Sequence, residues 1–216
     1  MGSLERVASE TRRVPVRAPP ARTWLLAATL CFAGLFALFS APPAPPADGS
    51  RIASAYLPLS IIEWMLLAYV HLADPSLLRS LRGRRRLLRD LGAGVGFALL
   101  VQLLAPLFPS SAALAPRTPA ERAAFIAVAL SAALSEELVF RGYLQEQLGL
   151  LLGRETPALV LQALLFGLVH AQQGARGAAV MFLAGLAFGA LARATRSIRA
   201  GLFAHALIDL LAGFLR

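Results

Sequence analysis

Long apolar runs, nearly free of charge, recur along this chain of 216 residues. Residues 123–134, for example, contain no charged side chain. Hydrophobic residues make up 57% of the chain and charged residues only 15%, and the mean hydropathy is +0.65. A soluble domain of this size does not reach such values. Because Leu and Ala dominate and strand patterns are weak, the sequence predicts an all-α, polytopic membrane helix bundle and not a barrel of strands.

The apolar runs predict about seven transmembrane helices and a simple division of the chain. We expect a basic cytoplasmic arm at 1–22, three N-terminal transmembrane helices within 23–115, and a core of four more within 116–216. Thr118, Pro119 and Glu121 form a typical helix start before the fourth helix. The expected spans are about 23–41, 52–73, 91–108, 119–152, 157–171, 175–192 and 197–215.

The arginines predict the orientation in the membrane. All 21 basic residues are Arg, and the net charge is +9. They concentrate in the arm and in the connections 74–90 and 193–199, between apolar runs, which is the pattern of cytoplasmic loops and not of a nucleic-acid site. We therefore expect a multi-pass protein of the cell membrane that binds no nucleic acid, with its N-terminus cytoplasmic and its C-terminus on the opposite side. The first run also resembles a secretion signal, but the prolines 42 and 43 after it favour an uncleaved anchor.

Two adjacent glutamates and an arginine interrupt one apolar run, in the stretch 135–141. A charge at membrane depth costs about 2.5–3.5 kcal/mol, so this cluster requires an explanation. On a helix, Glu137 and Arg141 share a face and are predicted to form an ion pair, whereas Glu136 lies about 100° away and stays unneutralised by it. The alternative is a helix end at the interface, with these charges among the headgroups.

Three further ionisable residues lie in the apolar runs that follow: His170, His205 and Asp209. In lipid each needs a polar partner, so we expect them to share one cavity with Glu136. Asp209 lies four residues after His205 and can accept from one of its ring nitrogens. Glu63, in the middle of an earlier run, has no apparent partner.

Such a cluster allows two kinds of chemistry. A carboxylate in a partly dry cavity can act as a general base on water. Glutamate and histidine can alternatively hold a divalent metal such as zinc, which would activate the water instead. The single cysteine excludes a cysteine-based metal cluster, and the His-Glu-x-x-His motif of zinc proteases is absent.

Three motifs in order, Glu136-Glu137-x-x-x-Arg141, Phe166-x-x-x-His170 and His205-x-x-x-Asp209, resemble those of a known family. It is the CAAX protease and bacteriocin-processing (CPBP) family of intramembrane proteases, also called Abi. The resemblance covers about the last hundred residues.

The resemblance implies a role for each motif residue. Glu136 would be the water-activating base, His170 would assist the water or the oxyanion, and His205 would act with Asp209. Glu137 and Arg141 would be the supporting ion pair, and Phe166 a packing residue. The family is described both as metal-dependent and as a metal-free glutamate type, and a metal, if present, would use Glu136, His170 and His205.

The resulting hypothesis is an intramembrane endopeptidase that hydrolyses a peptide bond of a membrane-anchored protein or peptide. The alternative is a non-catalytic immunity or scaffold protein of the same fold. A proton or cation pathway is a third reading, because buried acids and histidines also line such pathways.

Overall fold

The computed structural model describes residues 51–73, 81, 86–107 and 116–214, and all regular structure in this part of the chain is helical. The all-α prediction is therefore confirmed for these residues. The α-helices are α3 (Arg51–Ala73), α4 (Leu87–Leu104), α5 (Pro119–Glu136), α6 (Gln145–Leu152), α7 (Glu155–Val169), α8 (Gly174–Thr195) and α9 (Ile198–Phe214). The arm and the expected helix at 23–41 lie outside the described residues, so the count of seven stays a prediction.

Helices of other types join or extend these elements. A π-helix, η5 (Glu137–Leu144), connects α5 directly to α6, and two 3₁₀ turns, η3 (Ala105–Leu107) and η6 (Ala171–Gln173), follow α4 and α7. The segment expected at 119–152 is therefore continuous, as predicted, but its middle is not a regular α-helix. π-Helical turns are rare and are frequent at functional sites.

The start of α5 is set by its sequence. The Thr118 hydroxyl accepts a hydrogen bond from the backbone N–H of Glu121 at 3.1 Å, and Pro119 occupies the first turn. The Glu121 carboxylate reaches back to the N–H of Arg117 at 2.6 Å. These contacts satisfy N–H groups that a helix N-terminus otherwise leaves without partners, and they confirm the predicted helix start.

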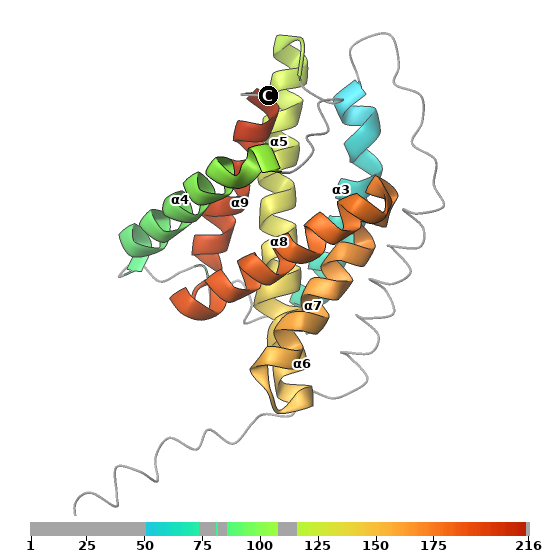
Figure 1. Cartoon of the computed structure of the whole chain (residues 1–216). Coiled ribbons are helices and arrows are strands. Elements are labelled where there is room, and N and C mark those ends of the chain that lie inside the picture. The colour runs from blue at the N-terminus through green and yellow to red at the C-terminus, as the bar shows by residue number, and fades with distance from the viewer. Residues whose placement is uncertain (1–50, 74–80, 82–85, 108–115, 215–216) are drawn as a thin grey trace, which may run out of the picture.

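The continuous helix α5–η5–α6 runs through the middle of the molecule, with the other helices packed around it (Figure 1). Helix α3 packs against α5, α4 packs against α9, and α7 packs against both α6 and α8. The hydrophobic core centres on η5, where Leu138, Val139, Phe140, Tyr143 and Leu144 are all buried. The stretch with the two glutamates is thus inside the bundle and not at an exposed helix end.

Three helices of the described chain are long and apolar enough to cross a membrane: α4, the continuous segment Pro119–Leu152, and α8. The segments Ser60–Leu72 and Glu155–Val169 are shorter apolar helices. Leucines on the outer faces, such as Leu88, Leu103 and Leu168, are exposed, as lipid-facing side chains must be.

Glycines allow close packing at particular helix crossings. A Cβ on Gly94 of α4 would lie 2.6 Å from the Ala200 carbonyl of α9, and a Cβ on Gly185 of α8 would lie 2.9 Å from the Ala163 Cα of α7. Around Gly92 and Gly96, in contrast, a Cβ would meet nothing within 4 Å. Of these three glycines of α4, only Gly94 therefore permits a close helix crossing, because the other two lie on faces that pack against none of the described helices.

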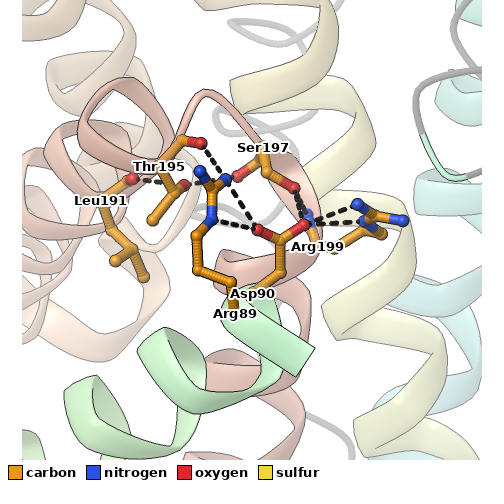
Figure 2. Close-up of polar contacts among 6 residues, drawn as sticks. All are labelled: Arg89, Asp90, Leu191, Thr195, Ser197 and Arg199. Atoms are coloured by element: carbon orange, nitrogen blue, oxygen red, sulfur yellow. Dashed lines mark hydrogen bonds and ion pairs between the residues drawn. The ribbon is translucent and has the colours of Figure 1, made fainter. Parts of the chain in front are cut away.

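A buried carboxylate ties α4 to the turn between α8 and α9 (Figure 2). Asp90 is fully buried and lies 2.7 Å from the Arg199 Nη2 and 2.9 Å from the Arg89 Nη2. It also accepts from the Ser197 hydroxyl at 2.8 Å, and that hydroxyl accepts from the N–H of Arg199 at the start of α9. The anchor sets where α9 begins. Helix α4 starts at Leu87, four residues before the expected position, so that Asp90 lies in its first turn.

Candidate active site

Glu136, the last residue of α5, lies between the two histidines that the sequence singled out. Its Oε1 is 3.8 Å from the His170 Nε2, and its Oε2 is 3.8 Å from the His205 Nε2. Glu136 is 9% exposed, and both rings are largely buried. The cluster predicted from the cost of burying polar groups is therefore present, although the roles of its members stay predictions.

His170 caps the C-terminus of α7, and its ring is fixed by the preceding turn. Its Nδ1 lies 2.8 Å from the Phe166 carbonyl oxygen. A carbonyl can only accept, so Nδ1 carries the proton in this contact. In a neutral ring Nε2 is then an acceptor, and it faces Glu136. The Phe166 ring, centred 4.7 Å from the imidazole, packs beside it.

His205 of α9 contacts three carboxylates. Its Nδ1 lies 3.3 Å from the Glu137 Oε1, and its Nε2 faces both Glu136 and the Asp209 Oδ2, the latter at 3.5 Å. Asp209 is therefore near the ring, as predicted. However, the better hydrogen bond runs from Nδ1 to Glu137, so Glu137 orients the ring. Spacing along one helix indicated only Asp209 as a partner of the ring, because Glu137 lies on another helix.

Glu137 and Arg141 form the expected ion pair, with 3.1 Å between the Arg141 Nη1 and the Glu137 Oε1, and both side chains are fully buried. The guanidinium also lies 4.3 Å from the centre of the Phe166 ring and 5.3 Å from that of Phe188. These cation–π contacts add favourable interactions for a desolvated charge. Because Glu137 also binds His205, the pair does more than hold its own helix.

Gly201 of α9 is a site residue that the sequence reasoning missed. A Cβ at this position would lie 2.4 Å from the Glu137 Oε2, so only glycine lets that carboxylate approach α9. Gly201, His205 and Asp209 recur at intervals of four residues and share one helix face. That spacing could have indicated Gly201 as a site residue, but many membrane helices carry glycines for packing alone.

Two residues that belong to no motif, Ser135 and Glu63, lie next to the site. The Ser135 hydroxyl, next to Glu136 in the chain, lies 3.1 Å from the Glu63 Oε2 of α3. Ser135 directly precedes Glu136, so this contact brings Glu63 to the edge of the site. The partner that the sequence could not identify for Glu63 is therefore Ser135, on a helix distant in sequence.

A metal ion at this site would need several ligand side chains directed at one point. Among the residues that the structure describes, no three His, Cys, Asp or Glu side chains are placed so that they could hold one. Ligands about 2.0–2.2 Å from a tetrahedral zinc ion lie about 3.3–3.6 Å from one another, so Glu136 and each ring, 3.8 Å apart, would have to move slightly closer to share an ion. The use of a metal therefore stays a prediction.

A protein-family model matches the part of the chain that bears the site. Residues 118–211 match the family model described as "Rce1-like: Type II CAAX prenyl endopeptidase Rce1-like". Neither a curated protein nor a solved structure matches the chain. The matched segment begins at the cap of α5 and extends through Asp209, so it includes all three motifs. The site-bearing part of this chain, residues 118–211, is therefore similar to the Rce1-like type II CAAX prenyl endopeptidase family, which agrees with the resemblance of its motifs.

Proposed function

We propose that the chain is an intramembrane endopeptidase in which Glu136 activates water to hydrolyse a peptide bond of a membrane-anchored protein or peptide. The single observation that supports this most is the position of the Glu136 carboxylate between two imidazoles, 3.8 Å from each. This distance is too long for a direct hydrogen bond, and it is short enough for one water to bond to both groups at about 2.8 Å.

The proton on the Nδ1 of His170 favours such a water between His170 and Glu136. The Nε2 of a neutral His170 and the Glu136 carboxylate are both acceptors, because the Nδ1 proton of His170 is used on the Phe166 carbonyl. A water between them donates one hydrogen to each, and its lone pair is left free to attack. This is the arrangement that general-base catalysis requires.

The proposed step conserves protons. Glu136 takes a proton from the water, and the water oxygen bonds to the carbonyl carbon of the scissile peptide. With a proton on each ring nitrogen, His205 donates from Nδ1 to Glu137 and from Nε2 to the developing oxyanion. The protonated Glu136 then gives its proton to the leaving nitrogen as the C–N bond breaks, which regenerates the carboxylate. No step passes through a metal.

The surroundings of the site favour a substrate that is itself in the membrane. Glu136 lies within the span Pro119–Leu152, and exposed leucines cover the outer faces of the neighbouring helices. A lipid chain or a helix would hold such a substrate at the depth of the site. We further propose a multi-pass arrangement in the cell membrane, with the N-terminus cytoplasmic and the C-terminus on the opposite side, on the basis of the arginine distribution.

The substitution Glu136→Gln tests the proposal, because it keeps the size of the side chain and removes its basicity. Membrane proteins would be compared between cells that express the wild type, Glu136→Gln or no protein, and the comparison would identify a precursor that stays uncut in the last two. Purified wild type should then cleave this precursor, whereas Glu136→Gln should be at least about 10²-fold slower. Glu155→Gln, at an exposed carboxylate near the start of α7, is the matched control and should cleave normally. Cleavage by Glu136→Gln at the wild-type rate would overturn the proposal and favour the non-catalytic alternative.

A further inference from the structure

Glu63 is a carboxyl in an apolar helix that lies outside the family-matched segment. It is half-buried, and Leu66, Leu67 and Val70, three, four and seven residues later on the same face, are buried in the core. Trp64 and Met65, next to it, are 47% and 68% exposed on other faces. The side chain of Glu63 is therefore directed toward the bundle. A charge at the centre of a membrane helix costs about 2.5–3.5 kcal/mol, so a carboxyl kept in this apolar helix indicates a role in function.

The contact of Glu63 is with the turn that carries Glu136. Its Oε2 lies 3.1 Å from the Ser135 hydroxyl, and that hydroxyl is also 2.9 Å from the Ser131 carbonyl of the preceding turn. Ser135 is 1% exposed, so water cannot replace Glu63 as a partner without rearrangement. The Glu63 carboxyl is therefore one of the groups that fix the side chain of the residue directly before Glu136.

A second contact between the same two helices lies one turn away and provides a comparison. The Trp64 Nε1 donates to the Ser131 hydroxyl at 2.6 Å, in a more exposed position. This bond also joins α3 to α5, but no hydrogen bond or ion pair in the described structure links either side chain to the two histidines or their carboxylates. Glu63, in contrast, accepts a hydrogen bond from the residue that directly precedes Glu136.

Accepting the proposed function, we infer that Glu63 of α3 is a positioning residue of the hydrolytic site, and that it holds Glu136 in register with the two histidines through Ser135. Helix α3 thereby completes a site whose motif residues all lie in 118–211. Catalysis therefore also requires α3, which none of the three motifs includes, and the core at 116–216 alone is not the full catalytic unit.

Kinetics of the full chain on the precursor identified above provide the test. In Glu63→Ala, kcat should fall about 10- to 100-fold with little change in KM, because small displacements of a catalytic group have effects of this size. Glu63→Gln still offers an oxygen to Ser135 and should restore kcat to within about threefold of the wild type. Trp64→Phe removes the neighbouring bond between the same helices and should leave kcat unchanged.

A double-mutant cycle separates positioning from general destabilisation. Ser135→Ala should reproduce the loss in kcat, and adding Glu63→Ala to it should cause little further loss, because both changes break one contact. Unchanged kcat in Glu63→Ala, an equal loss in Trp64→Phe, or additive effects of the two alanine substitutions would each overturn the inference. If Glu63→Ala does not fold, the kcat of Ser135→Ala alone tests the inference, and an unchanged kcat would overturn it. A wild type that cleaves nothing would overturn the proposed function itself, whereas an active wild type with an unaffected Glu63→Ala would overturn only the role of Glu63.

Discussion

The substitution Gly201→Ala adds a single methyl group at the closest approach between α9 and the buried ion pair. The new Cβ would lie 2.4 Å from the Glu137 Oε2 and 3.1 Å from its Cδ, whereas ordinary contacts begin at 3.4 Å. The carboxylate or α9 must therefore move by about 1 Å. The carboxylate cannot rotate away at low cost, because Arg141 and His205 both hold it.

The magnitudes of two opposing effects decide the expected result. Alanine is a better helix former than glycine by about 0.5–1 kcal/mol. Overpacking a tight site costs about 1–3 kcal/mol, so the free energy of unfolding should fall by no more than about 2.5 kcal/mol. His205 lies one turn further along α9, and a displacement of about 1 Å should lower the cleavage rate by about 10²-fold. Activity should therefore decline far more than stability does.

Matched glycines on α4 provide the control. A methyl group at Gly92 or Gly96 would meet nothing within 4 Å, so alanine there should leave stability unchanged or slightly higher and activity unchanged. Thermal unfolding in detergent and precursor cleavage would be measured for the three variants side by side. If Gly201→Ala behaves like Gly92→Ala in both assays, the packing of Glu137 against α9 is wrong.

Two further predictions concern the anchor of α9 and the use of a metal. Asp90→Asn should lower the free energy of unfolding by about 3 kcal/mol, because it removes the charge that a fully buried carboxylate offers to Arg89 and Arg199. Glu155→Gln breaks the exposed pair with Arg193 and should cost less than about 1 kcal/mol; equal effects in chemical unfolding would contradict the anchor. Extensive treatment with a chelator should leave the cleavage rate unchanged, since Glu136 is proposed to act on water directly; activity lost to the chelator and restored by zinc would show that a metal takes part.

Contacts between residues of one helix could be predicted from their spacing in the sequence. The pairing of Glu137 with Arg141 depends only on the separation of four residues, and the start of α5 depends only on the cap formed by Thr118. The convergence of Glu136 with His170 and His205 also followed, because apolar surroundings leave stranded polar groups few other partners. The π-helical winding of 137–144 did not follow, since no residue type marks it.

Helical structure and the ionisable groups that had to meet were predictable from residue order alone, because they follow from polarity and from helical periodicity. The folded structure was needed to show that Glu137 orients His205, that Gly201 makes room for this contact, and that Glu63 reaches the edge of the site from α3. These contacts join residues about 64 to 72 positions apart, and helix crossings, which no local pattern encodes, bring them together.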